Sequence, residues 1–243
     1  MSGLFLYAHR GASAEAPENT LAAFARALEA GADGVELDVH LSADGVPVVI
    51  HDETLERTTD GEGPVDAWER EYLQALDAGS WFAPHFAGEG VPTLDQVLHL
   101  LAGRLRLNLE VKDVRAGQAV LEALRGYPAA DVMLSSFDCG LLFALRRAAP
   151  EMPLAVLHDA GNWRRALGYA EALRAAAFHP RADLIGRPLL TACRSLRLPV
   201  YAWTVDDPGE ARALARMGVA GVFANDPAGL RGRLFPRPVA TVR

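Results

Sequence analysis

The chain has 243 residues, of which 50% are hydrophobic and 23% are charged, with a formal net charge of −7 and a pI near 5.5. This is globular composition, and the length is close to the ~250 residues of a typical α/β barrel. The acidic balance argues against a general nucleic-acid or anionic-membrane surface. A small anionic ligand stays compatible with it, because a bound divalent cation and local Arg or Lys side chains reverse the charge inside a pocket.

Signals for targeting and for disulfides are absent from the sequence pattern. The two cysteines, Cys139 and Cys193, have no CxxC or metal-like neighbours, which indicates small core residues. Residues 1–3 lead straight into an apolar segment, and no apolar run approaches the roughly 20 residues of a membrane helix. We therefore expect a cytoplasmic protein with no stable membrane association, and its oligomeric state stays open.

The first predicted unit is a strand, a helix and a second strand. An apolar run at 5–8 is followed by a helix predicted over 21–30, for which Asn19 is the expected N-cap and Gly31 the expected left-handed end. Apolar and polar residues then alternate over 34–40, which predicts the second strand. The helix between them makes the two strands parallel.

A hairpin is predicted directly after this strand. The gap before the apolar run 46–51 is too short for a parallel crossover, and Asp44-Gly45 is a two-residue hairpin signal. A turn at that position places Asp38 opposite His51, so that His51 shares a face with the acidic residues of the strand. A register shifted by one residue would turn His51 away.

Residues 52–92 break the rhythm of strands and helices, and we interpret them as a small inserted subdomain that caps one end of the barrel. A disordered linker is the alternative, and it is disfavoured because disordered segments are poor in aromatic residues. The aromatic side chains expected to anchor the insertion are Trp68, Tyr72, Trp81, Phe82 and Phe86.

Regular alternation resumes after the insertion. Residues 93–96 form a capping-box pattern that opens a helix to about Leu101. Further strands are predicted near 106–112, 132–137, 154–159, 176–180, 200–205 and 221–224. Together with the first two strands, they predict that residues 1–243 form a single (β/α)8 TIM barrel. A doubly wound open sheet is the alternative, weakened because no GxGxxG follows the first strand.

Charged and titratable side chains gather at the ends of the predicted strands, where barrel enzymes hold their active groups. They are three acids, two histidines and two cations: Glu36, Asp38, Glu110, His9, His51, Arg10 and Lys112. Three carboxylates from neighbouring strands suit one hard divalent cation, Mg2+ or Ca2+. Histidine suits acid–base chemistry because its ordinary pKa is about 6.5. The set matches the needs of phosphodiester cleavage.

The other histidines are weaker candidates. His179 ends a predicted strand and is a candidate for the barrel mouth. His158-Asp159 also ends a strand, where a cap or loop role is at least as well supported.

Motifs in the same order and spacing resemble those of the glycerophosphodiester phosphodiesterases over nearly the whole chain. They are His9-Arg10-Gly11, Pro17-Glu18-Asn19-Thr20, Glu36-Leu37-Asp38, His51-Asp52, Glu110-Val111-Lys112 and Trp203-Thr204-Val205. Two positions depart from the family pattern and bear on substrate selection. Asp206 stands where the family more often has Asn, and Asn225-Asp226 where it more often has Thr-Asp.

The resemblance implies a role for each site residue. The implied metal ligands are Glu36, Asp38 and Glu110, and the implied general acid–base pair is His9 and His51. Substrate contacts are implied for Arg10 and Lys112, which would hold the phosphate, for Glu18, which would fix Arg10 or a hydroxyl, and for Trp203, which would wall the pocket.

The implied activity is metal-dependent hydrolysis of a small glycerophosphodiester to an alcohol and glycerol 3-phosphate. One alternative is a lyase resembling phosphatidylinositol phospholipase C or sphingomyelinase D, which would form a cyclic phosphate. Another is a catalytically silent barrel that binds phosphodiesters, although a binder needs no acid–base pair. Attack by the neighbouring glycerol hydroxyl would give a cyclic intermediate that water then opens, and direct attack by water is the competing route.

Overall fold

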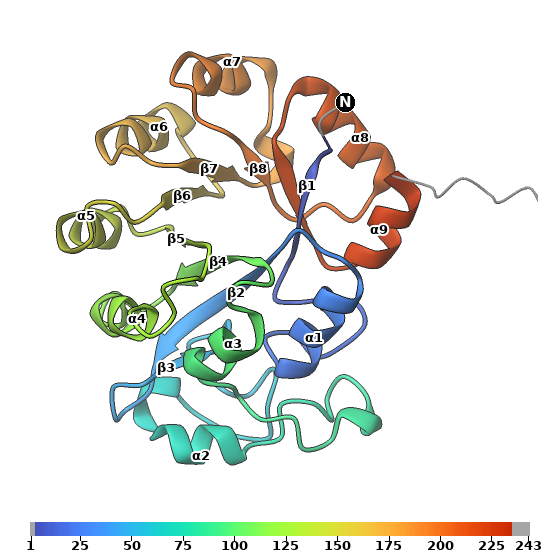
Figure 1. Ribbon diagram of the computed structural model, residues 1–243, viewed down its shortest axis with the longest axis vertical. Helices are drawn as coiled ribbons and strands as arrows, with labels where there is room; N and C mark the ends of the chain where they lie inside the picture. The colour runs from blue at the N-terminus through green and yellow to red at the C-terminus, as the bar shows by residue number, and fades with distance from the viewer. Residues whose placement is uncertain (1–2, 235–243) are drawn as a thin grey trace, which may run out of the picture.

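A computed structural model describes residues 3–234. Figure 1 shows the strands at the centre with the helices outside them. The parallel strands are β1 (Phe5–Ala8), β2 (Gly34–Leu41), β4 (Arg106–Val111), β5 (Val132–Ser136), β6 (Leu154–His158), β7 (Ala177–Pro180), β8 (Tyr201–Ala202) and β9 (Gly221–Ala224). They pair in the order β7-β6-β5-β4-β2-β1-β9-β8, and two isolated bridges join β7 to the β8 region. The ring confirms the predicted TIM barrel and excludes the open sheet.

Helices alternate with the strands around the ring, except for α2, which lies in the segment between β3 and α3. They are α1 (Leu21–Glu29), α2 (Arg70–Ala75), α3 (Leu94–Leu101), α4 (Ala116–Leu124), α5 (Cys139–Ala148), α6 (Trp163–Ala172), α7 (Arg187–Ser195), α8 (Pro208–Met217) and α9 (Pro227–Leu234). The predicted capping box at Thr93 and Gln96 is present at the start of α3. Within residues 3–234, no helix has the length and hydropathy needed to cross a membrane.

Two apolar layers hold the barrel together. Leu, Val and Ala side chains fill the space between strands and helices, and full burial of one Leu or Val contributes about 1.5–3 kcal/mol. Inside the ring, the stacked rings of Tyr7 and Phe223 have centroids 4.8 Å apart. Gly34 makes room for Tyr7, because a Cβ at that position would lie 2.6 Å from the Tyr7 ring. This aromatic packing closes the interior below the carboxyl ends of the strands.

The start of α1 differs from the prediction. Thr20, not Asn19, is the N-cap, and its hydroxyl accepts a hydrogen bond from the Ala23 N–H. Asn19 instead has a left-handed backbone, with φ of 58°, and turns its side chain to Asp38. Both residue types are good caps, so the sequence pattern did not distinguish them. Gly31 is left-handed as predicted, with φ of 68°.

The predicted hairpin exists, but its register is wrong by one residue. Strand β3 (Pro47–Val49) pairs antiparallel with β2, which places Ile50, not His51, opposite Asp38. The cause is the turn, a three-residue loop in which Gly45 has φ of 78°, rather than the two-residue turn expected. His51 lies beyond the end of β3, where the pairing no longer dictates its direction.

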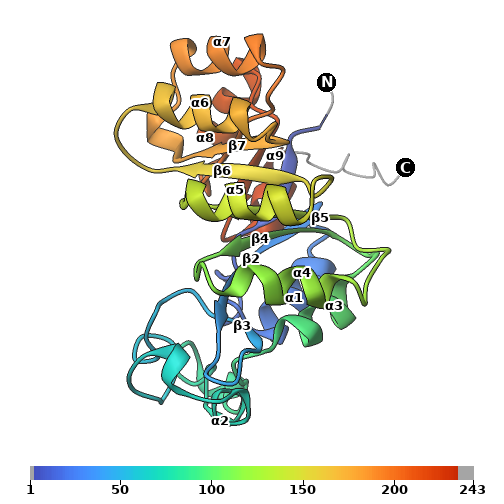
Figure 2. The same ribbon diagram turned by 90° about the vertical axis from the view of Figure 1, so that its left-hand side faces the viewer.

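Residues 52–92 form a compact segment beyond β3, at the bottom of the view in Figure 2. Its interior is aliphatic and includes Leu55 and Leu73, which are fully buried. The expectation of aromatic anchors was wrong for Trp68 and Tyr72, which stack on each other at the surface with centroids 4.2 Å apart, and for the exposed Trp81. Phe82 and Phe86 are half-buried and pack edge to face, with centroids 5.7 Å apart. Within residues 3–234, no residue of this segment lines the strand-end pocket, although His51 directly before it does. Its capping role stays a prediction.

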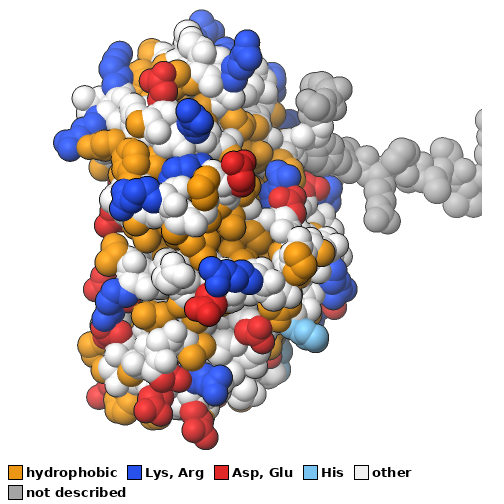
Figure 3. All heavy atoms as spheres, turned by 60° about the vertical axis from the view of Figure 1, so that its left-hand side comes forward, with side chains coloured by type: hydrophobic (Ala, Val, Ile, Leu, Met, Phe, Trp, Pro, Cys, Tyr) orange, Lys and Arg blue, Asp and Glu red, His pale blue; other side chains and the backbone are white. Residues whose placement is uncertain are grey.

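The outer surface carries both signs of charge. On the face in Figure 3, a band of hydrophobic side chains crosses the middle, with basic and acidic side chains on both sides of it. The predicted single domain also includes residues 1, 2 and 235–243, which lie outside the described residues.

Candidate active site

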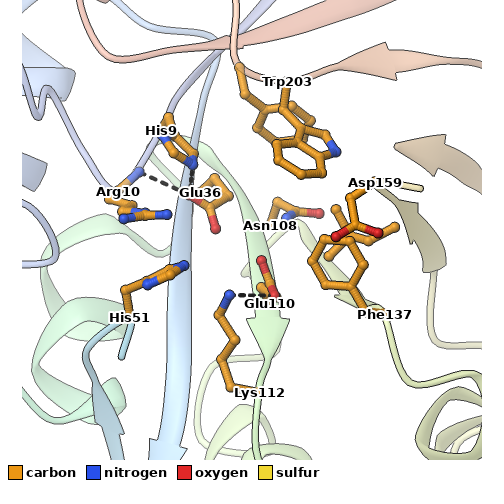
Figure 4. Close-up of a pocket in the computed structure, with 12 residues that line it drawn as sticks. His9, Arg10, Glu36, His51, Asn108, Glu110, Lys112, Phe137, Asp159 and Trp203 are labelled. Carbon is orange, nitrogen blue, oxygen red and sulfur yellow. Dashed lines mark hydrogen bonds and ion pairs between the residues drawn. The ribbon is translucent and has the colours of Figure 1, made fainter. Parts of the chain in front are cut away.

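A pocket with a volume of about 230 Å³ opens at the carboxyl ends of the strands. Figure 4 shows the side chains at these strand ends pointing into the pocket. Of the nine predicted site residues, seven line the pocket: His9, Arg10, Glu36, His51, Glu110, Lys112 and Trp203. The other two, Asp38 and Glu18, lie behind the lining and contact its cations. The remaining lining residues are Asn108, Phe137, Leu157, Asp159 and Phe223.

Three carboxylates form a compact acidic group on the wall made by β2 and β4. Asp38 pairs in register with Glu110, and Glu36 lies on the same face of β2. One oxygen of each carboxylate lies within 4.8 Å of the other two, and all three side chains are buried. Burial and mutual repulsion raise the pKa of Glu36 well above its ordinary value and the pKa of Glu110 to about 7. This oxygen-donor set fits a hard divalent cation, whose charge offsets the repulsion.

Two cations contact the acidic group. Lys112 Nζ lies 2.6 Å from Glu110 Oε1 and 3.2 Å from Asp38 Oδ1. Arg10 Nε lies 3.3 Å from Asp38 Oδ2. Burial alone would raise the pKa of Asp38, but the charges of Lys112 and Arg10 outweigh it and hold the pKa at about 2. Asp38 is therefore ionised at neutral pH, and the wall combines fixed positive charge with carboxylate oxygens.

The backbone at the end of β1 turns sharply to present His9 and Arg10. Arg10 has a left-handed backbone, with φ of 57°, and its N–H donates to Glu36 Oε2 at 2.9 Å. Gly11 follows with φ of 82°, and a Cβ there would lie 2.7 Å from the Ala23 backbone. Glycine is therefore required at this position, which explains the third residue of the His-Arg-Gly motif.

His9 is held by a neutral amide. Its Nδ1 lies 2.8 Å from Asn225 Oδ1, and the Asn225 side-chain NH2 donates to Asp206 Oδ2 at 2.8 Å. Because the carboxylate fixes the amide orientation, the oxygen faces His9, and Nδ1 must carry the proton. Nε2 is then the unprotonated nitrogen, 3.9 Å from Glu36 Oε2. Burial and the neighbouring Arg10 lower the pKa of His9 to about 4.

His51 is held by a carboxylate. Its Nδ1 lies 2.5 Å from Asp52 Oδ1, and the His40 ring nitrogen Nε2 lies 3.1 Å from the His51 carbonyl oxygen. Burial lowers the pKa of His51, while the charge of Asp38 and the bond to Asp52 act against that effect. The two histidines therefore differ in partner: a neutral amide for His9, an anion for His51.

An ion-pair network ties the insertion to the site. Arg57 donates to both oxygens of Glu18, at 2.8 and 2.9 Å, and to both oxygens of Asp52, at 2.6 and 3.0 Å. Glu18 in turn accepts from Arg10 Nη1 at 2.9 Å. Glu18 thus contacts Arg10, one of the two roles expected for it, and Arg57 connects the neighbours of Arg10 and His51.

The opposite wall of the pocket is aromatic. Trp203 and Phe137 meet edge to face, with centroids 5.8 Å apart, and Asp159 lies beside them (Figure 4). Trp203 is fixed by its indole N–H, which donates to the His179 carbonyl at 2.8 Å. His179 itself is fully buried beneath the pocket, against Tyr201 and Phe223, so this candidate for the barrel mouth does not lie there.

Sequence reasoning missed three supporting residues. Asn19 donates to Asp38 at 2.8 Å, Asn225 orients His9, and His40 contacts the His51 backbone. For Asn225, the departure from the family pattern at positions 206 and 225 was the available signal. The two departures form a hydrogen-bonded pair, because Asp206 accepts hydrogen bonds from both the side chain and the backbone of Asn225.

A family model for the glycerophosphoryl diester phosphodiesterases matches residues 9–229. The chain belongs to this family. A glycerophosphodiester phosphodiesterase of Caldanaerobacter subterraneus is 38% identical over 230 residues, which cover 90% of this chain and 93% of that protein.

Solved structures agree with the family assignment. A phosphodiesterase of Oleispira antarctica, solved in complex with the product sn-glycerol-3-phosphate, has a TM-score of 0.89 at 31% identity and covers 95% of this chain and 96% of its own. A glycerophosphodiester phosphodiesterase of Agrobacterium tumefaciens has a TM-score of 0.83 at 33% identity, with coverage of 94% and 99%. The family phosphodiesterase fold thus spans the described chain.

Proposed function

We propose that this chain hydrolyses small glycerophosphodiesters to an alcohol and glycerol 3-phosphate at the strand-end pocket. One observation supports the proposal most directly. A single pocket brings together a compact carboxylate triad, two cations, and two histidines of which one is bonded to an amide and the other to a carboxylate. The family, and the glycerol 3-phosphate bound by the Oleispira relative, support the same substrate class.

The residues proposed to hold one divalent cation, Mg2+ or Ca2+, are Glu36, Asp38 and Glu110. When bound, such a cation acts as a Lewis acid on the phosphoryl oxygens and on the attacking hydroxyl. Arg10 and Lys112 add positive charge where the phosphate would lie, which stabilises the charge that develops on its oxygens. Asn19 holds Asp38 from behind through its side-chain amide.

The two histidines are proposed to move the protons. His9 has its unprotonated Nε2 turned to the Glu36 side of the pocket, which suits it to accept a proton from the attacking hydroxyl. His51 donates through Nδ1 to the Asp52 carboxylate, which stabilises the protonated ring and suits His51 to protonate the leaving alkoxide. The nucleophile is either the neighbouring glycerol hydroxyl, already held within reach of phosphorus, or a water molecule.

Phosphorus NMR of the reaction with a glycerophosphodiester tests the proposal. We expect glycerol 3-phosphate to accumulate as the end product. Lasting accumulation of a cyclic glycerol phosphate would instead establish the lyase alternative. Binding without turnover, at any concentration of Mg2+ or Ca2+, would establish the silent barrel.

A further inference from the structure

A short chain of polar side chains from three neighbouring strand ends holds His9. His9 directly follows β1, Asn225 directly follows β9, and Asp206 lies in the loop between β8 and α8. These strands are adjacent in the ring, in the order β1-β9-β8. The His9 N–H donates to the Ala224 carbonyl at 2.9 Å, which fixes the spacing between the ends of β1 and β9. The closed barrel thus places the exposed Asp206 two hydrogen bonds away from a ring in the pocket.

The Asp206 carboxylate fixes the orientation of the Asn225 amide. Its Oδ1 accepts from the backbone N–H of Asn225 at 2.7 Å and from that of Asp226 at 3.2 Å. Its Oδ2 accepts from the Asn225 side-chain NH2 at 2.8 Å. An ionised carboxylate has no hydrogen to donate, so the amide must turn its NH2 to Asp206 and its oxygen to His9.

The other neighbours of the His9–Asn225 pair do not enforce this arrangement. The Ser13 hydroxyl donates to Asn225 Oδ1 at 3.0 Å, but a hydroxyl also accepts, so it would tolerate the turned amide equally well. On the pocket side of the ring (Figure 4), Glu36 Oε2 lies 3.9 Å from His9 Nε2. An ionised Glu36 would favour a proton on Nε2, which is the opposite arrangement.

We propose that Asp206 is a positioning residue for catalysis. Acting through Asn225, it keeps the His9 proton on Nδ1 and leaves Nε2 free to accept the proton of the attacking hydroxyl. The inference rests on the proposed function, in which His9 is the proton acceptor. Its physical basis is the direction of two hydrogen bonds, because the carboxylate accepts from the amide and the amide oxygen accepts from Nδ1–H.

A change of one oxygen to NH2 at position 206 should reverse both hydrogen bonds. In Asp206→Asn, the backbone N–H groups of Asn225 and Asp226 still need an oxygen at the Oδ1 position. The new NH2 then faces the Asn225 amide, which turns its own oxygen toward residue 206 and its NH2 toward His9. Nδ1 of His9 must then accept a hydrogen bond, so the ring proton moves to Nε2.

Two measurements on the full chain test the proposal. Nitrogen NMR of protein with 15N-labelled histidine shows which ring nitrogen carries the proton, and comparison with His9→Ala identifies the His9 signals. At neutral pH, we expect Nδ1–H in the wild type and Nε2–H in Asp206→Asn. With Mg2+ or Ca2+ present, kcat for glycerophosphocholine should fall by about 10²–10⁴-fold in Asp206→Asn, as it does on loss of a general base.

A double variant provides the rescue. When Asp206→Asn is combined with Asn225→Asp, the new amide donates to the new carboxylate, which in turn accepts from His9 Nδ1–H. The Nδ1–H form should return, and kcat should recover at least about tenfold relative to Asp206→Asn. Asp207→Asn is the matched control. It removes one charge at the next position and keeps the N-cap of α8, because Asn caps a helix as well as Asp does.

Several outcomes would overturn the proposal. Asp206→Asn that keeps Nδ1–H would show that Asp206 does not set the tautomer. Wild-type kcat in Asp206→Asn, or a double variant that regains Nδ1–H but no activity, would show that the tautomer does not control the rate. An equal fall in Asp207→Asn would assign the effect to lost charge alone. Failure of the wild type to hydrolyse any glycerophosphodiester would instead contradict the proposed function, while the NMR measurement would still test the action of Asp206 on His9.

Discussion

At the scale of single residues, the partner of each histidine decides what it can do. His9 has an amide oxygen at Nδ1 and His51 has a carboxylate. A neutral partner leaves the buried ring unprotonated at neutral pH, whereas an anionic partner favours the protonated ring. This difference in partner supports the proposed division of roles, in which His9 accepts a proton and His51 donates one.

His9→Ala and His51→Ala should each lower kcat by about 10²–10⁴-fold, because each removes one proton-transfer group. Neither ring is part of the main apolar core, so thermal unfolding should change little. Steady-state kinetics and calorimetry measure the two quantities, with His85→Ala outside the pocket as the control. A variant that keeps wild-type kcat would remove that histidine from the mechanism.

The charged residues of the pocket, including the proposed metal ligands, were predictable from the sequence, and the residues that hold them in place were not. Acids alternating with apolar residues on a strand share one face, so Glu36 and Asp38 were visible as a pair. Asn225 acts on a residue 216 positions away, through one hydrogen bond. Such contacts form only when the barrel closes, and they leave no local pattern in the sequence.

At the scale of elements, the hairpin after β2 shows how a correct element can carry a wrong register. The sequence predicts the turn region and the antiparallel strand, but a loop of two or three residues fits the same Asp-Gly signal. The difference shifts every cross-strand partner by one residue. His51 still reaches the pocket because it lies past the paired residues, where Asp52 and His40 fix it.

Two side chains of the insertion contact residues that support the site: Asp52 bonds His51, and Arg57 pairs with both Asp52 and Glu18. Arg57→Ala should lower kcat/KM about 10–100-fold, as is typical when a residue that orients a site is lost, because Glu18 and Asp52 both lose their fixed partner. Arg115→Ala is a matched control, since Arg115 also pairs across to the insertion, at Asp66, but lies outside the pocket. Equal kinetics for wild type and Arg57→Ala would show that the ion pairs of Arg57 do not support catalysis.

At the scale of the whole molecule, the barrel makes a site from residues that are far apart in sequence. Eight strand ends meet at one opening, so residues in or directly after β1, β2, β4, β5, β6, β8 and β9 supply side chains to one pocket. The periodicity of strands and helices sufficed to predict this architecture. The aromatic wall of the pocket was not predicted as a unit, because Phe137 and Asp159 are ordinary loop residues until the ring closes.

The most direct test of the site as a whole is glycerol phosphate release by protein stripped with a chelator and then titrated with Mg2+ or Ca2+. Cation binding should offset the repulsion among the three buried carboxylates. It should therefore also raise the free energy of unfolding, by about 2.7 kcal/mol at a cation concentration of 100 times Kd. We expect activity and thermal stability to fall together on chelation and to return together on titration. Glu36→Gln should respond in neither measurement. Full activity after exhaustive chelation would contradict a metal-dependent phosphodiesterase.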